Sequence, residues 1–340
     1  MMTHKIILAG CGGMSNEWLK YAAERENADI VGLVDLYEKQ AVKRAKEHGL
    51  NVPIFTDLSA AIEETGANLV FDVTIPSSHK QIVTTALQAG CNVFGEKPMA
   101  ESLEDALEMI KLTEQTGKRY SVMQNRRFLK KIRALRQTLK TDVIGTVGSI
   151  HANFFLGPHF GGFRDLMDHV LILDMAIHTF DQARFLTRAD PVSVYCHEYN
   201  PPGSWYKGNA SAICIFEMSD GSVFSYNGSW CAEGLPTSWE SEWRVTGSKG
   251  TAKWDGIHHP IVETVDESNQ DGFMRSYHRM EIPDTWEGRE GHSGCLDDMF
   301  DALEHDRLAE TDCTDNIKSI AMVLGAVESA KTGNKIEIGI

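Results

Sequence analysis

Three polar side chains, Asp174, His178 and Asp181, interrupt the apolar stretch of residues 170–186. The stretch contains neither Gly nor Pro, and its composition is typical of a buried helix. The spacing of i, i+4 and i+7 places all three side chains on one helical face, about one turn apart. A carboxylate one turn from a histidine can hold the imidazole ring and raise its pKa, which prepares a general acid/base. The alternative is a helix whose one polar stripe faces water, where an Asp–His pair stabilises the fold only slightly. It explains these residues equally well.

Length and composition narrow the classes of protein to consider. A chain of 340 residues is long for one core, so we expect two domains. A hydrophobic content of 42% and a charged content of 24% are ordinary for a soluble globular enzyme. The net charge of −15 argues against nucleic acid or an anionic membrane as a main partner. It does not exclude an anionic cofactor, because helix N-termini and local cations bind phosphate even in an acidic protein.

Several sequence signals are missing. No apolar run approaches the roughly 20 residues of a membrane span. The N-terminus, from Met1 and Met2 into the first strand pattern, lacks a signal-peptide cleavage region. The seven cysteines are scattered and form no C-x-x-C pair, so we expect neither disulfides nor a structural zinc. His258 and His259 do not suggest a metal pair, because adjacent residues in a strand point to opposite faces. These signals favour a cytoplasmic protein without a bound metal.

The first 35 residues contain a possible dinucleotide-binding arrangement. A β-type run at residues 5–9 meets the sequence Gly10-Cys11-Gly12-Gly13-Met14-Ser15, followed by a helical pattern at 17–25 and a second strand at 30–34. Gly10 permits a tight turn, Gly12 lets the backbone approach a pyrophosphate, and the helix N-terminus offers free N–H groups to the phosphates. Ser15 takes the position where Gly or Ala is usual, and it is small enough to keep the close packing.

Asp35 follows the second strand and indicates the cofactor. A carboxylate at this distance can accept both adenosine ribose hydroxyls and would repel a 2′-phosphate. The next residues, 36–38, include no Arg to receive that phosphate, although Lys39 is near. NAD is therefore favoured over NADP. An Asp that caps the following helix is the other interpretation, and it explains less of the pattern.

The βα alternation continues to about residue 123. Helices are predicted at 38–47, 60–64, 80–89 and from the capping box at Ser102 to Gly117, and strands at 52–55, 69–74, 92–95 and 120–123. The loop at 75–79 and the turn at 96–98 follow strand ends, where open α/β sheets bind ligands. The predicted cofactor contacts are Gly10, Cys11, Gly12, Gly13, Met14, Ser15, Asp35, Thr74, Pro76, His79, Glu96, Lys97 and Gln124.

Lys97 lies at the end of a predicted strand, directly before Pro98. In a dinucleotide-binding domain a cation at this strand end would lie near the nicotinamide. Together, the glycine turn at 10–13, the sequence Glu96-Lys97-Pro98 and the pattern Asp174-x-x-x-His178-x-x-Asp181 resemble the Gfo/Idh/MocA oxidoreductases. The similarity spans nearly the whole chain, and its three signatures occur in the family's order.

This resemblance implies an α/β fold. The expected architecture is a doubly wound, parallel Rossmann domain at residues 1–123, followed by an α+β domain at 124–340 with a large, open, mostly antiparallel sheet. It also implies that Lys97, Asp174 and His178 are catalytic, whereas Asp181 is expected to be structural. Residues 125–128 look like the family's segment that crosses between domains. The proline that usually follows is absent, which leaves the role of Arg127 in doubt.

The second half reads as several strands beside one or two helices. Strands are predicted at 147–156, 192–197, 210–217, 222–230, 242–246 and 250–254, with a hairpin turn at Asp220-Gly221. The basic helix at 130–140 is interpreted as a solvated face, and two helices after residue 292 as packing back on the first domain. Residues 225–230 suit either a wet sheet edge or a subunit contact, and the resemblance favours a homodimer or homotetramer through this sheet. The predicted substrate contacts are Lys97, Arg127, Asn153, His159, Arg164, Asp174 and His178.

The function expected from this reasoning is an NAD-dependent dehydrogenase acting on a hydroxyl carbon of a sugar, cyclitol or related polyol. Two alternatives use the same sequence features. One is a redox-assisted glycoside hydrolase or lyase, in which NAD is reduced only transiently. The other is a cofactor-sensing binding protein without chemistry, against which the presence of Lys97, Asp174 and His178 argues.

Overall fold

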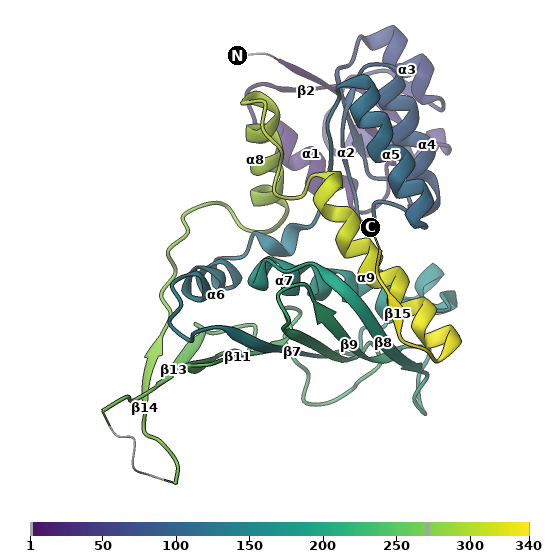
Figure 1. The fold of residues 1–340 in the computed structure, drawn as a ribbon. Helices are drawn as coiled ribbons and strands as arrows, with labels where there is room; N and C mark the ends of the chain where they lie inside the picture. Colours follow the sequence, from purple (N-terminus) through teal and green to yellow (C-terminus); the bar gives the residue numbers. More distant parts are fainter. Residues whose placement is uncertain (1–2, 269–272, 340) are drawn as a thin grey trace. The chain divides into compact units, whose positions relative to one another are not determined.

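A computed structural model describes residues 3–268 and 273–339 (Figure 1). The chain forms two compact units, the first made of Met1–Asn125 and Arg289–Ile320 and the second of Arg126–Gly288 and Ala321–Ile340. The first boundary therefore lies two residues after the expected one, and a segment near the C-terminus belongs to the first unit. Met1 and Met2, on which the expected lack of a signal peptide partly rests, lie outside the described residues.

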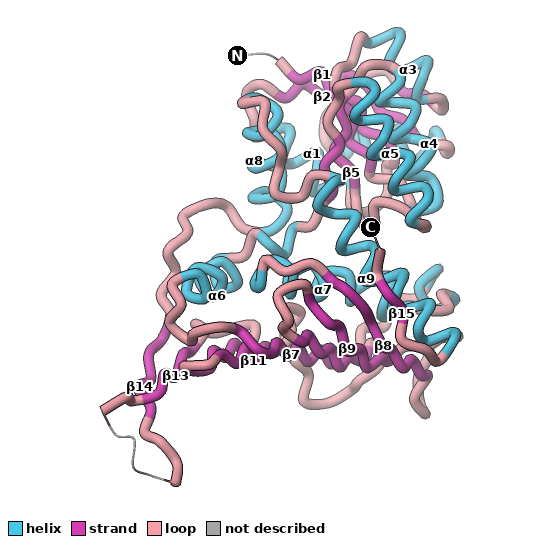
Figure 2. Tube along the Cα trace, viewed as in Figure 1, coloured by secondary structure: helices cyan, strands magenta, loops and turns pink. Residues whose placement is uncertain are grey.

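The first unit contains a six-stranded sheet in the order β3-β2-β1-β4-β5-β6, in which every pair is parallel. Figure 2 distinguishes strands from helices in this unit by colour. Its strands are β1 (His4–Ala9), β2 (Ala28–Val34), β3 (Ile54–Phe55), β4 (Leu69–Asp72), β5 (Asn92–Gly95) and β6 (Tyr120–Val122). Its helices are α1 (Ser15–Glu24), α2 (Glu38–Glu47), α3 (Leu58–Thr65), α4 (Pro76–Gln88), α5 (Leu103–Thr116) and α8 (Gly291–Glu304). The strand order reverses between β1 and β4, which is where doubly wound sheets bind ligands. The predicted Rossmann architecture is confirmed.

Local sequence signals explain most element boundaries in this unit. The Ser102 hydroxyl accepts the Asp105 N–H at the start of α5, and Gly117 ends that helix in the left-handed conformation (φ +66°). The prediction of a loop at 75–79 was wrong, because α4 begins at Pro76. A proline at the first helical position loses no hydrogen bond and has the φ angle of a helix.

Aromatic packing explains why the C-terminal segment joins the first unit. Phe300 of α8 packs edge-on against Phe71 of β4 and Phe94 of β5, with ring centroids 6.1 and 5.1 Å apart. Asp297, on the same helix, accepts a hydrogen bond of 2.9 Å from the Tyr21 hydroxyl of α1. The helix thus completes the core of a sheet whose own strands end about 170 residues earlier in the chain.

The second unit contains a nine-stranded sheet in the order β14-β13-β12-β11-β7-β10-β9-β8-β15. Its strands are β7 (Val147–Phe155), β8 (Pro191–Tyr199), β9 (Ser211–Met218), β10 (Val223–Ser229), β11 (Glu242–Gly247), β12 (Gly250–Trp254), β13 (Ile261–Val265), β14 (Tyr277–Glu281) and β15 (Ile336–Glu337). All pairs are antiparallel except β7 with β10, which is parallel. The expected large, mostly antiparallel sheet is confirmed, although β13, β14 and β15 were not predicted. The hairpin at Asp220-Gly221 does join β9 to β10, with Gly221 at φ +83°.

Helices also belong to this unit. They are η1 (Asn125–Arg127), at the boundary, α6 (Lys130–Lys140), η2 (Gly162–Leu166), the π-helical η3 (Leu171–Ala176) and α7 (Ile177–Thr187), and α9 (Cys313–Thr332) spans the unit boundary. Figure 1 shows α6 and α7 on the same side of the sheet. Phe180 of α7 packs edge-on against Phe216 of β9 and Tyr226 of β10. The core of the second unit lies at this interface.

The interpretation of α6 as a solvated basic face was wrong. The Arg133 guanidinium lies 4.5 Å from the Phe128 ring centroid and 4.6 Å from that of Trp286. The Arg136 guanidinium lies 4.0 Å from the ring centroid of Phe185. These cation–π contacts use the planar face of arginine, so the basic residues attach the helix to aromatic neighbours.

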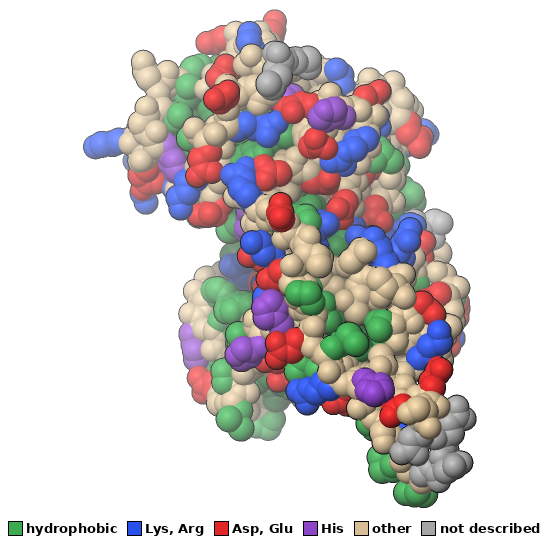
Figure 3. Space-filling view, turned by 90° about the vertical axis from the view of Figure 1, so that its left-hand side faces the viewer, with side chains coloured by type: hydrophobic (Ala, Val, Ile, Leu, Met, Phe, Trp, Pro, Cys, Tyr) green, Lys and Arg blue, Asp and Glu red, His purple; other side chains and the backbone are tan. Residues whose placement is uncertain are grey.

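Other expectations from the sequence concern the surface charge, membrane-spanning helices and the cysteines. On the face shown in Figure 3, acidic and basic side chains are interspersed. Within the described residues, no helix combines the length and apolar character that crossing a membrane requires. All seven cysteines are free thiols.

Candidate functional site

The glycine turn after β1 contains two kinds of glycine. Gly10 has φ +91°, and a Cβ there would lie 2.5 Å from the Val73 carbonyl oxygen, so this position requires glycine. A Cβ at Gly12 or Gly13 would meet nothing within 4 Å. Gly10 therefore packs the turn against the end of β4, and Gly12 and Gly13 leave an open backbone surface before α1. The positive φ of Gly10 fits a tight turn, and the contact of Gly12 with a pyrophosphate stays a prediction.

Side chains from outside the turn hold its backbone. One oxygen of Asp35 accepts the Cys11 N–H at 2.8 Å, and the other accepts the Tyr37 N–H at 2.8 Å. The N-cap residue of α2 is Tyr37, so Asp35 does not act as the helix cap considered above. Arg44 of α2, which the sequence reasoning missed, donates to the Gly12 carbonyl at 2.7 Å. In the sequence Arg44 is one basic residue on a basic helix, and this pattern alone does not distinguish it from its neighbours.

The Cys11 side chain is neutral in this turn. Burial, together with the negative charge of Asp35, raises the pKa of the Cys11 thiol to about 12. The thiol therefore carries no charge that would repel a phosphate. Ser15 is fully buried at the start of α1, and its hydroxyl donates to the Gly12 carbonyl at 2.6 Å.

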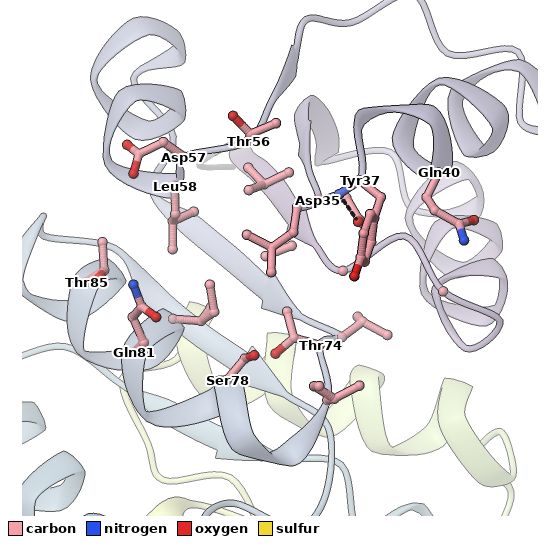
Figure 4. Close-up of a pocket in the computed structure, with 18 of the residues that line it drawn as sticks. Asp35, Tyr37, Gln40, Thr56, Asp57, Leu58, Thr74, Ser78, Gln81 and Thr85 are labelled. Atoms are coloured by element: carbon pink, nitrogen blue, oxygen red, sulfur yellow. Dashed lines mark hydrogen bonds between the residues drawn. The ribbon is translucent and has the colours of Figure 1, made fainter. Parts of the chain in front are cut away.

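A cavity of about 380 Å³ opens beside the turn, at the reversal of strand order (Figure 4). Of the predicted cofactor residues, its walls include Gly10, Gly12, Asp35 and Thr74. Leu58, Ile82 and Val34 supply an apolar side, while polar groups that the sequence reasoning did not select complete the lining; these include Tyr37, Gln40, Ser78 and Gln81. The donor set fits the adenosine half of a dinucleotide: a carboxylate for the ribose, an open glycine turn and a helix N-terminus for the phosphates.

The other predicted cofactor residues lie elsewhere in the first unit. Pro76 starts α4, and Met14 is the residue before α1. Gln124 follows β6 and is 1% exposed, and neither its amide nitrogen nor its oxygen has a hydrogen-bond partner among the described residues. A buried amide in this condition can bind a ligand group without first giving up a protein contact. Lys97 is half-buried in the turn after β5, next to a cis peptide bond to Pro98.

Glu96 and His79 do not face the open cavity. The Glu96 carboxylate accepts a 2.8 Å hydrogen bond from the Trp18 indole, and the His79 ring is fully buried beside Asp72. Neither residue is part of the cavity wall. Both side chains contact protein groups, and their contact with the cofactor stays a prediction.

The helix that carries Asp174 and His178 is not a wet surface helix. Residues 177–186 are all buried, and His178 is 8% exposed. Asp174 lies in the π-helical turn η3, whereas His178 and Asp181 lie in α7. A single π-helical turn inside a helix is frequent at functional sites. The interpretation as a polar stripe in water is therefore wrong.

The two carboxylates of this helix bind different arginines. Asp181 accepts two hydrogen bonds of 2.7 Å from Arg127, in a pair whose side chains are 2% and 7% exposed. Asp174 accepts a 2.6 Å hydrogen bond from Arg164, and these side chains are 12% and 31% exposed. The guanidinium of Arg164 also lies over the rings of Phe160 and Phe163. The first pair belongs to the core, and the second lies where a small molecule can reach it.

The remaining predicted substrate residues are more peripheral. Asn153 of β7 is exposed between buried Ala152 and Phe154, so it points to the sheet face away from α7. His159 stacks on the Trp205 ring at 3.7 Å and pairs with Glu233. Among the described residues, no cluster of three or more His, Cys, Asp or Glu side chains could hold a metal ion.

Comparison with known proteins identifies the family. The profile of the oxidoreductase family with an NAD-binding Rossmann fold matches residues 4–124, and that of the GFO/IDH/MocA C-terminal domain matches residues 132–253. The chain belongs to the Gfo/Idh/MocA family. Its first unit is therefore an NAD-binding Rossmann domain, and the protein is an oxidoreductase by family.

Similar proteins in this family act on sugars and cyclitols. The chain is 25% identical to a D-apiose dehydrogenase from Rhizobium rhizogenes, over 98% of this chain and 96% of the relative. It is 27% identical to an inositol 2-dehydrogenase from Ralstonia nicotianae, over 56% of this chain and 57% of the relative, so that match spans about half of each. An oxidoreductase from Agrobacterium radiobacter, solved in complex with NAD⁺, L-tartaric acid and magnesium, has the same fold, with 22% identity, a TM-score of 0.86 and 99% of each chain covered.

Proposed function

We propose that this protein is an NAD-dependent dehydrogenase that acts on a hydroxyl carbon of a sugar, cyclitol or related polyol. The observation that carries the proposal is the accessible Asp174 carboxylate one turn before a buried His178, in a chain whose Rossmann domain also has a lysine at a strand end. Relatives named as D-apiose and inositol dehydrogenases support the substrate class.

His178, Asp174 and Lys97 divide the proton chemistry, and Arg164 positions Asp174. The neutral imidazole of His178 accepts the hydroxyl proton of the substrate, and Asp174 stabilises the imidazolium that forms. Arg164 fixes the orientation of Asp174 through its 2.6 Å hydrogen bond. Lys97 donates a hydrogen bond to the reacting oxygen and stabilises the developing alkoxide. NAD, when bound, accepts the hydride. In the reverse direction the same groups protonate a ketone.

We also propose that NAD is preferred over NADP. The carboxylate of Asp35 forms part of the cavity wall and already accepts two backbone N–H groups, so it stays in place when a ribose binds. A 2′-phosphate beside this carboxylate would be repelled. The ratio of kcat/KM for the two cofactors tests the preference, and equal values would contradict it.

The test of the reaction is a screen of inositols, pentoses, hexoses and their keto derivatives, followed by NADH absorbance. Lys97→Met and His178→Ala should each abolish turnover, whereas NAD affinity measured by calorimetry should stay within about threefold, because neither residue contributes to the cavity wall. Full activity in both variants would refute the assignment. Product without net NADH would instead indicate a redox-assisted hydrolase or lyase, and NAD binding without any product a cofactor sensor.

The open face of the large sheet supports self-association. Tyr195, Ile215 and Ser225 lie side by side across β8, β9 and β10, and Ile213 lies on the same face; the Tyr195 and Ile215 side chains are 45% and 47% exposed. Exposed apolar rows on a sheet are typical of an interface between protein chains. We propose a homo-oligomer through this face. Light scattering of Ile215→Lys against wild type tests it, and an unchanged oligomeric mass would contradict it.

A further inference from the structure

A buried polar cluster lies beneath the turn that carries Lys97. Its members are Asp72 at the end of β4, His79 in the first turns of α4, and Glu96 directly after β5. The side chains of Asp72 and His79 are both 0% exposed, and Glu96 is 8% exposed. Buried polar groups destabilise the fold unless they form hydrogen bonds or ion pairs, so the partners of these side chains indicate the role of the cluster.

The cluster joins two neighbouring strand ends. Asp72 pairs with Gly95 across the parallel strands β4 and β5, and the Glu96 N–H donates to the Asp72 carbonyl at 2.8 Å. The Asp72 carboxylate accepts a hydrogen bond of 2.8 Å from His79 Nδ1 and one of 2.6 Å from the Thr74 hydroxyl. Because Thr74 belongs to the cavity wall and Lys97 follows Glu96, the cluster connects the cofactor cavity with the lysine turn.

The carboxylates of Asp72 and Glu96 lie in the interior at adjacent strand ends, and the Trp18 indole donates a neutral hydrogen bond to Glu96. A cation beside the two carboxylates would offset their negative charge. Burial disfavours a charged His79, but Asp72 and then Glu96 and Glu101 outweigh it, so the pKa of the imidazole is raised. Tyr120 of β6, which is near enough to Asp72 to be affected by its charge, stays neutral because burial raises its pKa well above the ordinary value.

We propose that His79 is a positioning residue, an imidazolium that balances the buried carboxylates of Asp72 and Glu96 and thereby fixes the turn that carries Lys97. His79 contacts the cluster through Nδ1, because its Nε2 is buried without a hydrogen-bond partner among the described residues. Without this cation, two carboxylates would repel each other at the point where β4 and β5 end. The turn after β5 would then shift, and the Lys97 amine would move with it.

The first experiment removes the charge and keeps the hydrogen bond. In His79→Asn the amide can replace Nδ1–H as the donor to Asp72, but no positive charge remains. As a matched control, His4→Gln alters another buried histidine paired with a carboxylate, Glu304, at the opposite ends of the strands. The readout that depends on the proposed function is turnover. We expect kcat to fall about tenfold to hundredfold in His79→Asn, with NAD affinity within about threefold, and no such fall in His4→Gln.

The second readout needs no substrate and therefore stands if the proposed function fails. Lysine amines are labelled by reductive ¹³C-methylation, and the NMR signal of Lys97 is assigned by its loss in Lys97→Arg. His79→Asn should shift this signal, and His4→Gln should leave it in place. Glu96→Gln, which keeps the acceptor for Trp18 and removes one carboxylate charge, should shift it as well. It replaces His79→Asn if that variant does not fold.

Each outcome of these two experiments either supports or overturns the positioning role of His79. A shifted Lys97 signal in the cluster variants, with NAD affinity retained, supports the positioning role whether or not a substrate is found. An unchanged Lys97 signal overturns it. A parallel loss of kcat, NAD affinity and thermal stability in His79→Asn, of the kind any core mutation causes, also overturns it, because the cluster would then only hold the fold.

Discussion

The two carboxylates of the site helix provide a test in which the same substitution has different effects on stability. Asp181→Asn removes the negative charge that the buried Arg127 guanidinium contacts through two hydrogen bonds of 2.7 Å, in a pair whose side chains are 2% and 7% exposed. Arg184, 3.9 Å away, adds a second positive charge. Breaking a buried ion pair from one side costs about 3–5 kcal/mol, so this variant should lose that much free energy of unfolding.

Asp174→Asn should behave differently. Its partner Arg164 is 31% exposed, so water solvates the guanidinium when the carboxylate is lost. The cost in unfolding free energy should be about 1 kcal/mol or less, as for other solvent-accessible pairs. Turnover should nevertheless fall about 10²–10⁴-fold, because the imidazolium of His178 loses its stabilising charge.

Urea unfolding followed by circular dichroism gives the two free energies, and NADH absorbance gives the two rates. The double variant Arg127→Met/Asp181→Leu serves as control, because removing both charges should recover much of the stability that Asp181→Asn loses. The reasoning is refuted if Asp174→Asn destabilises the protein as much as Asp181→Asn does. It is also refuted if Asp181→Asn unfolds within about 1 kcal/mol of wild type.

Two further predictions concern the first unit. Gly10→Ala should abolish NAD binding in calorimetry, because its Cβ would lie 2.5 Å from the Val73 carbonyl oxygen. Gly13→Ala should fold normally, because nothing lies within 4 Å of the added Cβ. Equal stability of the two variants would contradict the close approach at Gly10. Burial opposes ionisation of Glu304, but hydrogen bonds from its neighbours outweigh this and lower its pKa to about 2. Because the folded-state pKa lies below the usual glutamate value of 4.5, the charged carboxylate stabilises the fold above pH 4.5, and this stability is lost as the pH falls towards 2. Glu304→Gln should therefore unfold at a lower urea concentration than wild type at pH 7, and the difference should disappear near pH 2. A difference that stays constant with pH would contradict this prediction.

Local sequence determined the elements that carry the chemistry. The bounds of α2 and α6 follow from their helical pattern, and the glycine turn, the acidic residue after β2 and the capping box of α5 rest on neighbours within a few residues. The spacing of Asp174, His178 and Asp181 likewise placed these residues in one helix. Such features depend on backbone conformation and short-range periodicity, which adjacent residues specify.

Tertiary structure alone decided what each of these side chains contacts. Asp174 and Asp181 have the same chemistry in the sequence, yet one binds a partly exposed arginine 10 residues before it and the other a buried arginine 54 residues before it. The parallel pairing of β7 with β10, and the burial of Glu96 against Trp18 and of His79 against Asp72, depend equally on distant segments. Periodicity defines a face, but the burial and charge of that face are set by whichever segment packs on it.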